Sequence, residues 1–455
     1  MARSPVRELT QGNPLKLILG FAAPLLFGFL FQQLYSFVDT AIVGRYLGAN
    51  SLAAVGDTGS INFLILGFCQ GFCAGFSIPV SQCFGARDYG KLRQYTANAV
   101  YLGAALSLCM AFLATALCPV MLRLMNTPEE ILPEAVAYIR VVFAGIPATI
   151  LYNLSSGILR ALGDSKTPVY YLIMASLINI VLDLVLILYV HMGVAGAAVA
   201  TVVSQVLAGI GCVITMKRHF PILHLSAEDR VLRIGLIREL AGIGLPMGLQ
   251  YMITAVGSVI VQWSVNALGV VSVAAVAAGS RISMFFCCVF DTLATTMATF
   301  AGQNLGARKL SRITEGLRSA GIIGIIYCVT ALGIILLFDR YLIGLFVNST
   351  SDPEVLALAC RYLRLNSLFY IPLLFVNIVR LTIQGMGYTQ IAMLAGVFEM
   401  IARTTVALFL VPRLGFTGAC LANPAAWIMA DLFLFPCYFH VMHMVRQRLH
   451  EPKST

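Results

Sequence analysis

An acidic side chain inside an apolar run is the first feature of this sequence that could do chemistry. Asp39 lies in FQQLYSFVDTAIVGRYLG (31–48), and the apolar run around it extends back to Leu15. A charged side chain near the centre of a bilayer costs at least about 2.5 kcal/mol, so such residues usually face a protein interior or a wet cavity. We therefore predict that Asp39 belongs to a functional site.

Three further acids, Asp291, Glu399 and Asp431, lie in apolar runs of the second half. Glu399 and Arg403 are one helical turn apart, which predicts a salt bridge within one helix. Asp291 has no such local partner, and it is our candidate for contact with a cation in the second half. Gln70 lies 221 positions before it, the spacing of the internal repeats described below. We expect both side chains to line a central cavity.

The composition is that of a polytopic membrane protein. The chain has 455 residues, 59% of them hydrophobic and 11% charged, whereas soluble domains carry roughly 25% charged residues. Runs of about 20 apolar residues recur along it and leave no segment of the size of a soluble domain. The pattern predicts an all-α protein with about twelve spanning helices, at approximately 14–43, 52–82, 94–118, 133–160, 167–190, 194–216, 238–266, 274–303, 315–338, 355–384, 389–411 and 415–444.

The basic residues predict the orientation of these helices. A formal net charge of +10 could indicate nucleic acid in a soluble protein, but here the basic residues collect in loops on one side. By the positive-inside rule both termini are expected in the cytoplasm, with no nucleic-acid partner. The start of the chain lacks the pattern of a cleaved signal peptide, so we expect it to remain as a cytoplasmic tail.

Internal repeats divide the chain near its middle. QCFGAR (82–87) recurs as QNLGAR (303–308), and LGANSLAAV (47–55) recurs as LGVVSVAAV (268–276), both 221 positions later. Two halves of the same topology are expected to be related by an axis along the membrane normal, with a cavity between them. We predict two pseudo-symmetric six-helix lobes, with the N-lobe at 1–216, a cytoplasmic linker at 217–237, the C-lobe at 238–444 and a cytoplasmic tail at 445–455.

Two other interpretations of these motifs are weaker. Neither copy of the GAR loop has the spacing of a phosphate-binding loop, and its position after even-numbered helices favours a capping turn. A membrane-embedded enzyme would need paired catalytic groups at helix ends. The six histidines lie mostly in loops and the tail, so we expect no enzymatic activity.

The motifs resemble those of multidrug and toxic compound extrusion (MATE) transporters. They are the GAR loops after the second and eighth helices, the pattern from Pro24 to Gly48, and GILRALGDSKTP (157–168). The resemblance implies an inner-membrane antiporter that expels organic cations and multiple drugs against an inward flow of protons or sodium ions. We expect it to act as a monomer and to need no cofactor other than the coupling ion. The alternative is a lipid-linked oligosaccharide flippase of the same superfamily, which would need arginines in its cavity.

The resemblance also implies a coupling site in the N-lobe. In the DinF-like and archaeal branch this site comprises two acids, an Asn and a hydroxyl, which here are Asp39, Asn179, Asp183 and Thr201. Asn179 and Asp183 are four residues apart and project from one helical face. Two carboxylates in a low dielectric repel each other, so the pair is expected to take up a proton or a cation. Sodium would need about five or six oxygen ligands, of the kind that these four side chains offer.

Other residues are expected near this site or along the cavity. Tyr35 precedes Asp39 by one turn and could bond to it or line the cavity, as could Tyr138 from the fourth helix. Pro24 frees a backbone carbonyl inside a long helix and permits bending, and the resemblance implies that this helix bends when the coupling ion binds. Adaptable apolar side chains suit promiscuous binding, and our lining candidates are Met174, Met252, Met284 and Phe285.

Overall fold

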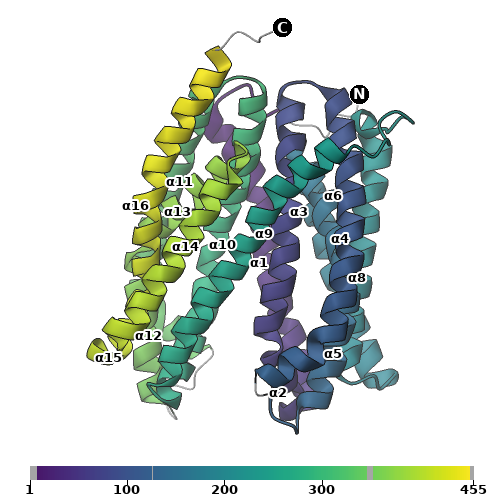
Figure 1. Ribbon diagram of the computed structural model, residues 1–455. Coiled ribbons are helices and arrows are strands. Elements are labelled where there is room, and N and C mark those ends of the chain that lie inside the picture. The colour runs from purple at the N-terminus through teal and green to yellow at the C-terminus, as the bar shows by residue number, and fades with distance from the viewer. Residues whose placement is uncertain (1–7, 126, 346–351, 451–455) are drawn as a thin grey trace. The chain divides into compact units, whose positions relative to one another are not determined.

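A computed structural model describes residues 8–125, 127–345 and 352–450, and within these ranges the chain forms helices and no strands (Figure 1). Helices are expected throughout a membrane protein of this kind, because lipid cannot satisfy backbone polar groups. The α-helices of the first half are α1 (Pro14–Leu47), α2 (Ala49–Asp57), α3 (Gly59–Gly85), α4 (Tyr89–Leu124), α5 (Leu132–Ala144), α6 (Ile146–Ala161), α7 (Lys166–Leu184) and α8 (Val194–His219). Those of the second half are α9 (Ile234–Asn266), α10 (Val270–Gly306), α11 (Leu310–Gly344), α12 (Pro353–Leu368), α13 (Tyr370–Gly385), α14 (Thr389–Thr405), α15 (Val411–Leu414) and α16 (Phe416–His450).

The described residues contain ten helical segments long and apolar enough to cross a membrane, or up to twelve if each of two bent helix pairs is one span. The chain is therefore a multi-pass membrane protein, as the sequence predicts. The bent pairs are α5 with α6, at 43°, and α12 with α13, at 53°.

Two of the spans predicted from the sequence, 133–160 and 355–384, are thus bent helix pairs in the structure. The first break lies at Gly145 and the second at Phe369. Pro147 and Pro372 each lie in the first turn of the helix that follows a break. Proline has no N–H to donate to the preceding turn but fits the first turn of a new helix, so the helix restarts there in a new direction.

The chain divides into two compact units. The first unit comprises Ala23–Met252 with Glu8 and Leu9, and the second comprises Thr10–Ala22 with the described residues from Ile253 onward. Within the first unit α3 packs on α6, and α8 packs on α6 and α7; within the second, α10 packs on α13 and α14 on α16. The division falls inside α1 and α9, whereas the predicted lobes meet in the connection 217–237.

The two halves share rare backbone conformations at equivalent positions. Gly48 and Gly269 precede α2 and α10 with φ of 91° and 94°, and Gly193 and Gly415 have φ of 60° and 56°. A single π-helical turn also follows α7 (η1, Val185–Tyr189) and α14 (η3, Val406–Leu410). Because such conformations are uncommon, their recurrence supports the internal duplication that the repeated motifs indicate.

The GAR loops are capping turns, as the sequence predicts. Arg87 and Arg308 both adopt a left-handed conformation, with φ of 58° and 57°. Asp88 N–H donates to the Cys83 carbonyl at 3.0 Å, and Lys309 N–H donates to the Asn304 carbonyl at 2.8 Å. These bonds satisfy carbonyl groups that the ends of α3 and α10 would otherwise leave free.

Two glycine pairs bring α3 and α9 into close contact within the first unit. Gly71 and Gly75 face the part of α9 that carries Gly244 and Gly248, and both pairs have GxxxG spacing. A Cβ on Gly75 would lie 2.6 Å from the Gly244 Cα. Small residues at this spacing allow helix backbones in a membrane to approach closely.

We predict that Gly75→Ala destabilises the protein, since the added methyl group meets backbone atoms that cannot move aside independently. Overpacking of this kind costs about 1–3 kcal/mol. Thermal unfolding of purified protein measures the effect, and Gly242→Ala on α9 is the matched control because a Cβ there meets no atom within 4 Å. The control is expected to unfold at or above the wild-type temperature; equal unfolding temperatures for both variants would contradict the packing argument.

The connection between α8 and α9 is attached to α4 by a buried carboxylate. Arg93 Nε donates to Asp229 Oδ2 at 2.7 Å, and Ser226 donates to the same oxygen through its N–H at 3.0 Å and its hydroxyl at 2.8 Å. Burial by itself would raise the pKa of Asp229, but these donors outweigh it and lower the pKa below its usual 3.8. The fold therefore favours the ionised carboxylate.

We predict that Asp229→Asn loosens this connection at pH 7, at a cost of about 1–2 kcal/mol. The folded-state pKa is depressed, so the stabilisation is fully present above the unfolded value of about 4 and is lost as the pH falls through the folded value. Thermal unfolding of wild type and variant between pH 7 and pH 3 should show a difference that shrinks in acid. Glu228→Gln, which changes an exposed neighbouring acid, is the control; a pH-independent difference would contradict the assignment.

Candidate functional site

Residues from three helices of the first unit meet in one polar cluster. Tyr35 and Asp39 lie one turn apart on α1, and both are half-buried. The Tyr35 hydroxyl lies 3.5 Å from Thr201 Oγ1 on α8. Gly28 lets α1 approach α7, because a Cβ there would lie 2.8 Å from a methyl group of Val169.

Asn179 and Asp183 on α7 are the buried part of this cluster, with exposed fractions of 1% and 0%. The Asn179 amide makes hydrogen bonds to its neighbours when its nitrogen faces Asp183 and Tyr35. The nitrogen then donates to Asp183 at 2.8 Å and lies 3.2 Å from the Tyr35 hydroxyl oxygen. Its carbonyl oxygen then accepts from the Thr201 N–H at 2.9 Å. Asn179 therefore connects α7 to both α1 and α8.

The carboxyl groups of Asp39 and Asp183 lie close enough to each other for a hydrogen bond between them. A hydrogen bond between two carboxyl groups requires a proton on one of them. The Oδ1 atom of each is buried and has no hydrogen-bond partner among the described residues. The pair thus presents two acceptor atoms, in a protein interior, that a proton or a cation could occupy.

An apolar cluster covers the site on one side. Ile42 and Val43 of α1 pack there with Ile187 and Ala197, and Tyr138 of α5 packs against them. Ile187 belongs to η1, the π-helical turn that begins two residues after Asp183. Turns of this type are frequent at functional sites because they change the direction of neighbouring side chains, and the apolar sequence VLILY gives no signal for one.

Comparison with known proteins identifies the family. The family model MatE matches residues 24–185 and 246–409, once in each half of the chain. The chain belongs to the MATE family of transporters. "Probable multidrug resistance protein YpnP" of Bacillus subtilis is 31% identical over 373 residues, which are 82% of each chain. "Probable multidrug resistance protein YoeA" of the same organism is 27% identical over 92% of each.

A solved MATE structure shares the fold. The crystal structure of MATE in complex with MaL6 matches with a TM-score of 0.91 at 22% identity, over 98% of this chain and 100% of that one. The predicted resemblance and the all-α fold with two sets of membrane helices are therefore confirmed. The roles of Asp39, Asn179, Asp183 and Thr201 stay predictions, although the structure brings the four together as the MATE resemblance implies.

The predicted lining residues of this MATE chain lie on several helices. In the first unit Gln70 and Met174 are exposed and Met252 is half-buried; in the second Met284 and Asp291 are exposed and Phe285 is half-buried. The polar positions Gln70 and Asp291, equivalent in the two repeats, are thus both accessible. Pro24 lies inside α1, which continues as a helix past it, so the predicted bending stays a prediction.

The second unit contains a buried charge network that the sequence predicts only in part. The expected pair of Glu399 and Arg403 is confirmed, with Oε2 and Nη1 at 3.3 Å. Arg380 of α13 also donates to Glu399, and Asp431 of α16 interacts electrostatically with Arg380 and Glu399. Sequence reasoning missed Arg380 because it lies 19 residues before its partner, which is no helical spacing.

The sodium prediction concerns the oxygen atoms of the polar cluster. No group of three or more His, Cys, Asp or Glu side chains that could hold a metal ion occurs among the described residues. In the polar cluster Asn179 turns its nitrogen to Asp183, and its carbonyl oxygen is engaged by Thr201. Oxygen atoms of Asp39, Asp183, Tyr35, Asn179 and Thr201 meet in this cluster, and sodium binding there stays a prediction.

Proposed function

We propose that this MATE transporter exports drugs, organic cations among them, in exchange for protons bound by Asp39 and Asp183. The closeness of these two carboxyl groups, each with a buried and unpartnered Oδ1 atom, is the observation that carries the proposal. The relatives named as multidrug resistance proteins support drug export. The acids inside apolar helices support cation coupling, because intramembrane acids mark ion pathways.

The proton is our preferred coupling ion because the cluster is arranged around a singly charged pair. Asn179 donates one hydrogen bond to Asp183, which stabilises one negative charge. Losing the shared proton would place a second negative charge beside the first in a low dielectric, where like charges repel strongly. Proton binding and release thus change the electrostatic energy of the contact between α1 and α7. In our proposal this change drives the bending of α1 at Pro24.

The substrate class follows from side chains outside this pair. Asp291 supplies an accessible carboxylate for a cation, and Met284 and Phe285 of the same helix supply adaptable apolar contact. The flippase alternative would need unneutralised arginines, but Arg380 and Arg403 both contact Glu399. The drug and the proton then need not share a ligand.

We propose that the protein lies in the inner membrane, surrounded by membrane lipid, with both termini in the cytoplasm. We also propose that it acts as a monomer. The GAR turns and the connection between α8 and α9 support this orientation, because they carry clusters of basic residues. No cofactor besides the coupling ion is proposed.

Transport by purified protein in proteoliposomes, under separately imposed gradients of pH and sodium, tests the proposal. We expect a pH gradient to drive accumulation of a fluorescent cation such as ethidium, and a sodium gradient at constant pH to have no effect. Transport driven equally by sodium alone would overturn proton coupling. Absence of transport under both gradients would overturn the antiport mechanism, provided that the reconstituted protein is folded by its thermal unfolding curve.

A further inference from the structure

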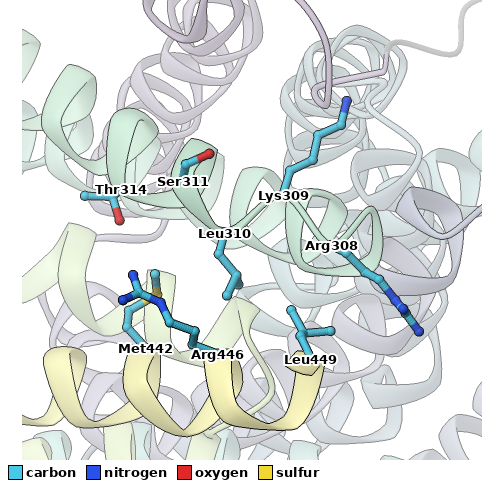
Figure 2. Close-up of a pocket in the computed structure, with 8 residues that line it drawn as sticks. All are labelled: Arg308, Lys309, Leu310, Ser311, Thr314, Met442, Arg446 and Leu449. Carbon is cyan, nitrogen blue, oxygen red and sulfur yellow. The ribbon is translucent and has the colours of Figure 1, made fainter. Parts of the chain in front are cut away.

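A basic pocket of about 540 Å³ lies within the second unit, where the turn between α10 and α11 faces the last turns of α16 (Figure 2). Its lining combines three cations with two hydroxyls and an apolar floor: Arg308, Lys309, Leu310, Ser311, Thr314, Met442, Arg446 and Leu449. No acid is among these described lining residues. The transport site involves none of them.

Two of the three cations have no charged partner. Within the described part of the chain neither Arg308 nor Arg446 forms an ion pair, and both are exposed. Figure 2 shows the guanidinium of Arg446 beside Thr314, and that of Arg308 on the other side of the pocket. Lys309 instead donates to the Thr10 carbonyl at 3.0 Å. The pocket is therefore flanked by two uncompensated positive charges on flexible side chains.

Hydroxyl groups and apolar side chains complete the pocket. The Thr314 hydroxyl lies 3.2 Å from the Tyr438 hydroxyl, a contact that joins α11 to α16. From Met442 an apolar surface continues along α16 through Phe439, which is 67% exposed, to Leu432, which is 69% exposed. Guanidinium and hydroxyl groups suit phosphate oxygens. The adjoining apolar surface suits a hydrocarbon chain, which a free phosphate lacks.

We propose that this pocket binds the phosphate head group of an anionic phospholipid, with Arg308 and Arg446 as its charge partners and the acyl chains along α16. Basic pockets between membrane helices are suited to acidic lipid head groups. An anionic lipid is favoured over a zwitterionic one, because no lining acid is present to pair with a head-group ammonium.

Lipid titration of the full-length protein tests the proposal. The probes are nanodiscs of phosphatidylcholine containing increasing phosphatidylglycerol, with the thermal unfolding temperature as the readout and bound lipid counted by native mass spectrometry. We expect phosphatidylglycerol to raise the unfolding temperature of the wild type. In Arg308→Gln/Arg446→Gln the apparent affinity for phosphatidylglycerol should fall about 25-fold, since each basic residue near the surface contributes about fivefold.

Arg448→Gln is the matched control. Arg448 lies two residues beyond Arg446, stacks over the Tyr388 ring at 5.8 Å, and is not a lining residue. The proposal predicts a wild-type response for this variant. It is overturned if the double variant responds like the wild type, or if Arg448→Gln loses as much as the double variant, which would indicate nonspecific surface charge. Inorganic phosphate that stabilises the wild type as strongly as the lipid would overturn the lipid assignment in favour of a free phosphate.

Discussion

Asp39→Asn and Asp183→Asn are each expected to reduce drug export to the background of an efflux-deficient host, while insertion and expression stay at the wild-type level. An asparagine amide cannot take up or release a proton at physiological pH, so either change removes the proton that the two acids are proposed to share between α1 and α7. The acceptor atoms of the pair are buried, which means that no solvent group replaces the lost carboxyl. Minimum inhibitory concentrations of cationic drugs, with immunoblots of the membrane fraction, measure the result.

Two controls separate coupling from folding. Asp57→Asn changes an acid of the same unit that accepts a hydrogen bond from the Thr127 hydroxyl at 2.5 Å, outside the cluster, and it is expected to preserve resistance. Asp39→Glu keeps an ionisable group and is expected to retain part of the activity. Wild-type resistance in both Asn variants would refute the proposed role of the acid pair.

Glu399→Gln is expected to have the largest effect on stability. Glu399 is 3% exposed and neutralises Arg380 and Arg403, which are each 6% exposed. Without this carboxylate, Asp431 is the one remaining acid in the network. Removing one partner of a buried ion pair costs about 3–5 kcal/mol, because the remaining charge is uncompensated. The loss should appear as a lower unfolding temperature and a smaller yield of monodisperse protein.

Two further variants serve as comparisons for Glu399→Gln. One changes an ion pair with an exposed arginine, and the other removes a cation together with Glu399. Asp339 is buried but pairs with Arg364, whose side chain is 46% exposed. Asp339→Asn leaves a guanidinium that water can solvate, so it is expected to cost less than Glu399→Gln. Glu399→Gln/Arg403→Gln removes one excess cation and should recover part of the lost stability. If Glu399→Gln unfolds at the wild-type temperature, the network does not stabilise the second unit as argued.

The arginine partners of Glu399 also bear on whether Glu399 or Asp39 is the better candidate for ion coupling. Glu399 is an intramembrane acid, and its place in an apolar run resembles that of Asp39. Its two arginine partners distinguish it, because its carboxylate is already paired with charged groups of the fold. Asp39 and Asp183 have no basic side chain among their described hydrogen-bond partners, so we propose these two acids, and not Glu399, as the coupling residues.

Local patterns in the sequence were sufficient to predict the membrane class, most spans and the internal duplication, and to single out Asp39 as a candidate functional residue. Hydropathy and turn motifs act over a few residues, and a helix in lipid must satisfy its own backbone groups, so neighbours in sequence decide these features. The four-residue spacing of Asn179 and Asp183 likewise places both on one face without knowledge of the fold. The resemblance to a family was needed to connect them with Asp39 and Thr201.

Only the tertiary structure decided which side chains meet. Tyr35 and Thr201 are 166 residues apart, and their contact depends on how far α1 and α8 are rotated about their axes. The same holds for Arg380 with Glu399, for the direction of the Asn179 amide, and for the bends at Gly145 and Phe369. Rotation and approach of helices are set by packing of many side chains at once, such as the glycines of α3 and α9. Asp39 is thus singled out by its sequence, but its closeness to Asp183 is a property of the folded chain.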